Sequence, residues 1–317
     1  MATIEKSRFE WVGSDPENRE GIARASITYW QDALNRLKKN KVAVVCFFLI
    51  CLIILSAIIL PFVSAFSSSE QHLGEINKGF FTPCTDERYA GENHMHIFGT
   101  DTLGRDLFTR AFEGGRVSLI IAFAAVAVNL VIGLIYGGIS GYIGGTVDNI
   151  MMRVVEVING IPYLIVVILL LMVMPKGIFT LVIAYGITSW TGMARLVRGQ
   201  ILQLKSQEFV VAAEAMGANA SRIIARHLIP NALSVIIINI TMAIPSAIFT
   251  EAFLSYLGLG VPVPQPSWGV LAQDGQQRFM VYPYQLLIPA CFISVTMLSF
   301  NLLGDGLRDA FDPRLRR

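Results

Sequence analysis

The stretch EFVVAAEAMGANASRIIARHLIP, Glu208 to Pro230, is polar and basic, yet it lies between long apolar segments. Ser206 is placed to cap a helix that begins near Glu208, and Gly217 is placed to end it, because glycine adopts a left-handed closing conformation without strain. A second short helix should stop at Pro230, which cannot donate a backbone hydrogen bond. Within residues 204–230 we therefore expect a helical docking loop, formed by Glu208, Ala212, Ala213, Glu214, Gly217, Ser221, Arg222, Arg226 and Pro230.

The rest of the chain has the composition of a membrane protein. Of its 317 residues, 54% are hydrophobic and 15% are charged, and the mean hydropathy is +0.57. A helix that crosses a bilayer needs roughly 20 mostly apolar residues. We therefore predict an all-α integral membrane protein with six transmembrane helices, at Val42 to Val63, Val117 to Gly138, Val154 to Met174, Gly177 to Val197, Val235 to Leu257 and Tyr284 to Leu303.

Basic residues indicate the orientation. Most of the 25 Lys and Arg residues fall on the side that holds the N-terminus, and they are densest from Arg36 to Lys41. By the positive-inside rule both termini and the docking loop are expected to be cytoplasmic. The predicted segments are a cytoplasmic stretch 1–41 with an interfacial helix from Ile22 to Leu37, a first membrane helix 42–63, an external loop 64–116, a five-helix core 117–303 that includes an external loop 258–283, and a cytoplasmic tail 304–317.

Three patterns predict local structure outside the docking loop. Glycines recur every fourth residue near the end of the second membrane helix, which would let another helix approach closely. In the external loop, oppositely charged residues four apart predict an amphipathic helix with Asp101–Arg105 and Asp106–Arg110 pairs. The glycines that recur every fourth residue are Gly133, Gly137, Gly141 and Gly145.

Proline-rich residues 258–282 predict a stiff cap with a helical turn near residues 270–277.

Ser140, in the sequence Gly138 to Gly141, raises the alternative of an intramembrane serine protease. A serine nucleophile needs a base, and no histidine lies in any predicted span. The glycine pattern explains the same residues through helix packing, so no catalytic residue is predicted.

His94 and His96, with Glu92 nearby, raise the alternative of a metal site in the external loop. Two histidines separated by one residue are a weak signal without a second group of ligands. Surface polar residues are the preferred interpretation, and no metal site is predicted. Of the four cysteines only Cys84 lies outside the predicted spans, so no disulfide framework is implied.

Two transporter classes have no separate ATPase, and only the second remains as an alternative. A self-powered pump would need a phosphate-binding G-x-x-x-x-G-K-[ST] motif, which the sequence lacks. A secondary transporter or channel would place polar or ionisable groups within the membrane. The candidates for such a translocation path are Asn129 and Glu251.

The docking loop resembles the EAA loop of bacterial ABC importer permeases, with Ala212, Ala213, Gly217 and Pro230 at the family's offsets. It departs from the general pattern at three positions, in the manner of the peptide and nickel branch. The resemblance to oligopeptide and dipeptide permeases continues elsewhere. The departures are Val211, His227 and Ile229, and the further segments are Phe98 to Leu119, Ile244 to Gly260 and the C-terminal run NLLGDGLRDAFDPRLRR.

This resemblance implies a type I ABC importer permease fold in the bacterial cell membrane. It implies a non-catalytic subunit that pairs with a second homologous permease, two cytoplasmic ABC ATPases and an external substrate-binding protein. ATP and Mg would be bound by the ATPases and no cofactor by this chain, and nucleic acid is not an expected partner. The implied cargo is oligopeptide, with dipeptide, nickel or haem-like cargo as alternatives. The implied mechanism is alternating access driven through the docking loop.

Overall fold

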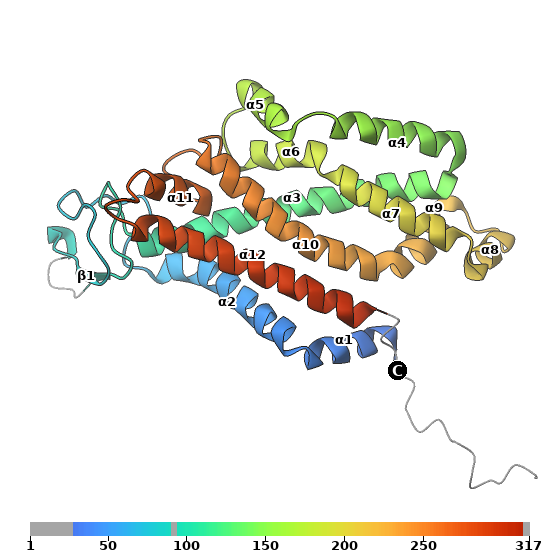
Figure 1. Ribbon diagram of the computed structural model, residues 1–317, viewed down its shortest axis with the longest axis horizontal. Helices are drawn as coiled ribbons and strands as arrows, with labels where there is room; N and C mark the ends of the chain where they lie inside the picture. Colours follow the sequence, from blue (N-terminus) through green and yellow to red (C-terminus); the bar gives the residue numbers. More distant parts are fainter. Residues whose placement is uncertain (1–27, 90–93, 313–317) are drawn as a thin grey trace, which may run out of the picture.

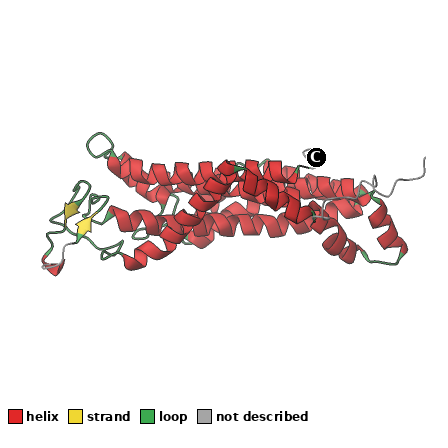
Figure 2. Cartoon of the chain, turned by 90° about the horizontal axis from the view of Figure 1, so that it is seen from below, coloured by secondary structure: helices red, strands yellow, loops and turns green. Residues whose placement is uncertain are grey.

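The computed structural model describes residues 28–89 and 94–312 as an elongated bundle of helices with a small non-helical region at one end (Figure 1). The non-helical region, called the hairpin end below, carries β1 (Thr82–Pro83), which pairs antiparallel with β2 (Met95–His96). Figure 2 shows the two strands at one tip of the molecule. The opposite end, called the α8 end below, carries α8 (Glu208–Ala215).

Four of the six predicted spans are confirmed as helices that are long and apolar enough to cross a membrane. The longest, α3, has 37 residues and at 1.5 Å per residue extends about 55 Å, beyond the roughly 30 Å hydrocarbon core. It begins ten residues before the predicted span. The four are α2 (Lys41–Val63), α3 (Leu107–Ile143), α10 (Ile229–Tyr256) with the turns that lead into it, and α12 (Tyr284–Phe311).

The third and fourth predicted spans are interrupted. In place of one straight helix, α4 (Gly145–Asn159) and α5 (Tyr163–Val173) meet at an angle of 78°. Pro162 lies in the break, where it lacks a backbone donor and disfavours helical geometry in the residue before it. The fourth span is divided into α6 (Ile178–Thr188) and α7 (Trp190–Lys205).

The docking loop continues into the next membrane helix without a stop. After α8 come α9 (Ala220–Ile223) and a π-helical turn, η4 (Ile224–Leu228), which runs directly into α10. The prediction that Pro230 ends the second helix is therefore wrong. Proline is tolerated in the first turn of a helix, and Pro230 lies in the first turn of α10.

The predicted charged helix in residues 101–110 is also wrong. Asp106 is the N-cap of α3, and its carboxylate accepts a 2.7 Å hydrogen bond from the backbone N–H of Thr109. The Asp101–Arg105 pair forms at 2.6 Å, but in the turn before the helix. Arg110 lies 3.5 Å from Asp101 instead of pairing with Asp106. A capping aspartate is favoured at this position because it satisfies free backbone donors.

Both described ends of the chain lie toward the α8 end (Figure 1). Within the predicted interfacial helix, Tyr29–Lys39 form α1, and residues 22–27 lie outside the described residues; its position at the membrane surface stays a prediction. The hydroxyl of Tyr29 donates to the carbonyl of Phe311 in α12 at 3.3 Å, and the ring of Trp30 lies edge-on to the Phe311 ring. The predicted turn near 270–277 is confirmed as α11 (Trp268–Gln276), and a short 3₁₀ turn, η3 (Glu87–Tyr89), lies in the hairpin region.

Candidate functional site

The inner face of α8 is anchored to the body of the bundle. Val210 is 0% exposed and Ala213 is 2% exposed, and both belong to a core with Ile201 of α7, Ile223 of α9 and Leu228 of the π-turn. Ala213 was predicted to contact a partner, but its side chain packs inside this chain. The same core includes Ala232 and Ile236 of α10, so α8 is packed into one hydrophobic cluster with α7, α9 and α10.

The outer face of α8 is unusually apolar for an exposed surface. Met216, directly after the helix, is 82% exposed and Val211 is 56% exposed. Phe209 and Ala212 are exposed on the same short element. Grouped exposed apolar side chains mark interaction sites more often than scattered ones. Glu214 is held to the end of α3, since its carboxylate accepts a 3.0 Å hydrogen bond from the Tyr142 hydroxyl.

The end of α8 has the geometry that glycine favours. Gly217 has a φ of +81°, its N–H donates to Glu214 at 2.9 Å, and the N–H of Ala218 donates to Ala213 at 3.0 Å. These two hydrogen bonds form a Schellman motif. The expected cap at the other end is wrong, because Ser206 donates to the Gln203 carbonyl and Gln207 occupies the N-cap position without a side-chain bond.

A basic hollow of about 390 Å³ lies beside α8. Arg222 and Arg226 are exposed there, and neither forms an ion pair with a described residue. Asn219, which the sequence analysis missed, caps α9 by accepting a 2.9 Å hydrogen bond from the N–H of Arg222. Ser221 is exposed on the same turn. The hollow is lined by Ala213, Met216, Gly217, Ala218, Arg222, Arg226 and His227.

The glycines of α3 lie against α7. A Cβ atom at Gly137 would lie 2.3 Å from the Ala194 carbonyl oxygen, and one at Gly133 would lie 2.5 Å from the Cβ of Met193. Gly141 is similarly close to Arg198 and Ile201. The prediction is wrong for Gly145, which starts α4 with a φ of +60° and has open space around it.

The contacts of Ser140 are those of a structural residue and not of a nucleophile. It is fully buried, and its hydroxyl donates to Asp148 at 2.5 Å. Arg198 of α7 donates two hydrogen bonds to the same carboxylate, at 2.5 and 2.6 Å. These contacts tie α3, α4 and α7 together and leave the hydroxyl engaged with a carboxylate that is itself paired.

The two predicted path residues lie inside the subunit. Glu251 is 2% exposed, and its carboxylate accepts hydrogen bonds of 2.7 Å from the hydroxyls of Ser118 and Ser255. The backbone N–H of Trp268 donates to Ser118 at 3.2 Å, so Glu251 joins α3, α10 and α11. Asn129 is 6% exposed. Neither side chain is on a surface that a second subunit could line.

A polar hollow of about 560 Å³ lies instead at the two helix breaks. The Thr191 hydroxyl of α7 donates to Asn159 at the end of α4, at 2.9 Å, and links the breaks. Arg195 is exposed at this hollow. Broken helices within membranes are tolerated where they line a cavity. In the sequence, Gly160 and Pro162 in the third predicted span and Ser189 in the fourth could have indicated the two breaks. The hollow is lined by Ile158, Asn159, Ile161, Pro162, Tyr163, Tyr185, Thr188, Ser189, Thr191, Gly192, Arg195 and Thr250.

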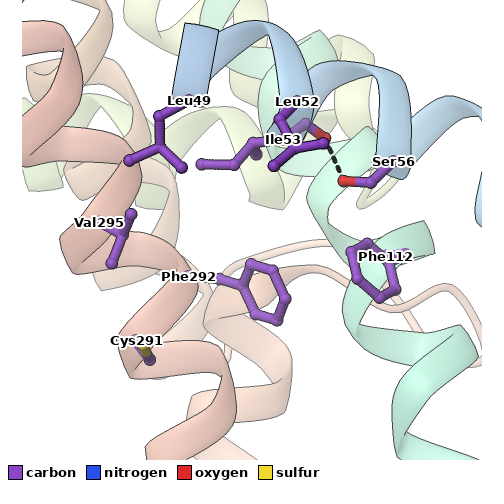
Figure 3. A pocket seen from close by; sticks show the side chains of 8 residues that line it. All are labelled: Leu49, Leu52, Ile53, Ser56, Phe112, Cys291, Phe292 and Val295. Carbon is purple, nitrogen blue, oxygen red and sulfur yellow. Dashed lines mark hydrogen bonds between the residues drawn. The ribbon is translucent and has the colours of Figure 1, made fainter. Parts of the chain in front are cut away.

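A further groove, between α2, α3 and α12, is apolar (Figure 3). Figure 3 shows side chains of α2 facing Phe292 and Val295 of α12. Its one hydroxyl, on Ser56, donates to the Ile53 carbonyl at 2.9 Å. The groove therefore offers no free polar group to a charged cargo.

Surface positions were predicted for His94 and His96, and this prediction is wrong for His96, while His94 is half-buried. His96 is 0% exposed, with Nδ1 2.8 Å from Asp106 and Nε2 2.9 Å from Glu75. Burial opposes its charge, but hydrogen bonds to the two carboxylates outweigh it and raise the pKa of His96. His94 lies in the same region, and Glu92 lies outside the described residues.

A bundle of apolar helices, with two predicted spans broken around a polar hollow and an anchored helix exposed at one end, is typical of the membrane component of a transport system. The comparisons agree. The chain belongs to the family described as "Binding-protein-dependent transport system inner membrane component", whose model matches residues 129–317. A model described as "N-terminal TM domain of oligopeptide transport permease C" matches residues 28–80. The protein is a multi-pass protein of the bacterial cell membrane.

Its relatives are named as peptide permeases. The chain is 47% identical to the oligopeptide transport system permease protein OppC of Bacillus subtilis, over 100% of both chains. It is also 47% identical to the dipeptide transport system permease protein DppC of the same organism, over 97% of this chain and 94% of the relative. The fold resembles an inward-facing structure of the MetNI methionine ABC transporter, with a TM-score of 0.50 and 20% identity over 62% of this chain and 94% of the other.

Proposed function

We propose that the chain is a non-catalytic permease subunit of an ATP-driven importer of peptides. Two relatives with equal identity, one named for oligopeptides and one for dipeptides, support peptide cargo without favouring a length. In this proposal the chain pairs with a second, similar permease, two cytoplasmic ATPases bind ATP and Mg, and an external binding protein delivers the peptide.

The observation that carries the proposal is the division of α8 into two faces. Val210 and Ala213 fix it to α7 and α10, while Val211 and Met216 remain exposed at the tip. A helix with this division suits insertion into a cleft of an ATPase, where apolar contact drives binding. Arg222 and Arg226 beside it suit acidic residues of that partner, which would fix the register of docking.

The α8 end is the cytoplasmic end in this proposal. Arg36, Lys38 and Lys39 in α1 lie toward it, which agrees with the positive-inside rule. Both chain ends would then be cytoplasmic, and the hairpin end would be external. Six crossings follow if the bent α4–α5 pair is one span and α6 with α7 is another.

The polar hollow at the helix breaks is the proposed path surface, in place of Asn129 and Glu251. Its hydroxyl and amide groups can hydrogen-bond to peptide backbones, and Arg195 can attract a carboxylate. The second permease would close the hollow from the other side. Movement of α8 would tilt α7 and α10, which border the hollow, and so alternate its access between the two sides.

The test uses one substitution at the α8 tip and one at the hairpin end. Met216→Asp should leave membrane insertion unchanged, because Met216 is 82% exposed, but should abolish co-purification of the ATPase subunits and peptide uptake. Met280→Asp is the matched control, since Met280 is 95% exposed far from α8 and should bind the ATPases normally. Normal ATPase binding by Met216→Asp would refute the docking assignment.

The alternative class, a secondary transporter or channel, predicts a different result. In that class, peptide would cross the membrane of vesicles that contain this chain alone and no ATPase. Flux without ATP would exclude the importer mechanism, whereas flux only with all subunits and ATP would support it.

A further inference from the structure

Three potential metal ligands meet at the hairpin end, outside every site described above. One ligand atom each from His72, Glu75 and Cys84 lies within 4.8 Å of the other two. His72 is 1% exposed and Glu75 is 2% exposed, while Cys84 is half-buried. All three belong to the segment between α2 and α3, where β1 and its flanking turns bring them together.

His72 presents a buried nitrogen without a partner. Its Nδ1 lies 2.8 Å from the Asp86 carboxylate, which can only accept when ionised, and 3.4 Å from a guanidinium nitrogen of Arg88. In the tautomer that donates from Nδ1 to Asp86, Nε2 has a free lone pair, and Nε2 makes no hydrogen bond with any described residue. A buried polar atom left without a partner is unfavourable, so a bound ligand at this position would be stabilising. A histidine that donates one nitrogen to a carboxylate and offers the other is the usual arrangement of a metal ligand.

Glu75 is held in place and keeps room for a ligand bond. One of its oxygens accepts hydrogen bonds from the hydroxyl, at 2.8 Å, and the backbone N–H of Thr85. The other accepts from Nε2 of His96 at 2.9 Å. Each carboxylate oxygen has two lone pairs, so the second oxygen can still accept one bond.

Cys84 lies between these groups as a free thiol. A divalent ion would replace the proton of the Cys84 thiol, because coordination favours the thiolate strongly.

We propose that His72 Nε2, a Glu75 carboxylate oxygen and Cys84 Sγ bind one zinc-class divalent ion, with water as the fourth ligand. Nitrogen, oxygen and thiolate sulfur together suit Zn²⁺, which is borderline-soft and tetrahedral. Bond lengths of about 2.0–2.3 Å place ligand atoms roughly 3.3–3.8 Å apart, so ligand atoms now within 4.8 Å of one another would approach by about 1.5 Å at most. Binding releases one proton, from the thiol, and involves no redox change.

The ion would stiffen the connection between the hairpin segment and the long helix α3. Glu75 contacts His96, and His96 contacts Asp106 at 2.8 Å. Asp106 in turn caps α3 through Thr109. The metal would therefore fix one end of a chain of contacts whose other end is a helix of the membrane bundle.

The experiment measures bound zinc on the full-length chain in detergent, purified with a tag that lacks histidine and cysteine. After equilibration with ZnCl₂ and gel filtration, we expect one zinc per chain by elemental analysis. Cys84→Ser and His72→Gln should each weaken binding at least about 10-fold, and Asp86→Asn about 10–100-fold through ring orientation. Cys291→Ser and His94→Gln are the controls and should bind normally. Unchanged zinc in Cys84→Ser would refute the site.

A second measurement uses the unmutated chain, so it tests the site even if the variants fail to fold. Zinc should slow maleimide labelling of Cys84, read by peptide mass spectrometry, and a chelator should restore the rate. Co²⁺ in place of zinc should give thiolate-to-cobalt charge-transfer absorption. Labelling of Cys84 that is indifferent to zinc, or cobalt without this absorption, would overturn the proposal.

Discussion

Gly137→Ala tests whether α3 and α7 need a glycine where they meet. The added Cβ would lie 2.3 Å from the Ala194 carbonyl oxygen and 2.9 Å from the Val197 Cβ, against an ordinary contact distance of 3.4–4 Å. The closest atom is backbone, so the helices must separate by about 1 Å, which forfeits a quarter to a half of the dispersion attraction along the seam. Overpacking of this kind costs about 1–3 kcal/mol.

Gly199→Ala in α7 is the matched control, because nothing lies within 4 Å of its added Cβ. There the substitution should be neutral or stabilising by up to about 1 kcal/mol, from helix propensity alone. Thermal unfolding of the purified chain in detergent compares the two. At about 2–4 °C per kcal/mol, Gly137→Ala should melt several degrees below Gly199→Ala. Equal melting temperatures would refute the close-approach argument.

Substitutions at three further positions test other features of the structure. Glu251→Ala removes the acceptor of Ser118 and Ser255, so it should lower stability by about 1–3 kcal/mol while leaving cargo preference unchanged in competition uptake; a changed preference would contradict the structural role. Gly217→Val should cost about 1–2 kcal/mol and impair ATPase-coupled uptake, whereas Gly217→Asn, which tolerates positive φ, should retain more activity; equal loss in both would count against the closing turn. Asp148→Asn weakens the bonds from Arg198 and should lower the melting temperature by a few degrees; an unchanged melting curve would mean the pair contributes nothing.

Strong and local signals allowed much of the fold to be predicted from the sequence. Long apolar runs located α2, α3, α10 and α12, since a run of that length has few other stable states. Gly217 closes α8 as expected, because the left-handed position favours glycine for a local steric reason.

The errors fell where tertiary contacts choose between local options. Asp106 could pair with Arg110 or cap a helix, and only the position of His96 and Thr109 decides for the cap. Ala213 could face a partner or the core, and the packing of α8 on α7 decides for the core. Glu251 looked functional because an acid in an apolar run is rare, but Ser118 of α3 and Ser255, one turn along α10, satisfy it.

The π-turn at Ile224–Leu228 determines how α8 is rotated about the axis of α10. One residue of an α-helix corresponds to a rotation of about 100°. A π-turn accommodates one residue more than regular α-helical pairing would. Removal of a single residue such as Ala225 would therefore rotate the outer face of α8 about the axis of α10 by roughly a quarter of a circle. The exposed side chains of α8 would be unchanged but would face a different direction. The length of this turn therefore fixes the direction of the outer face, which no substitution of a single contact residue would reveal.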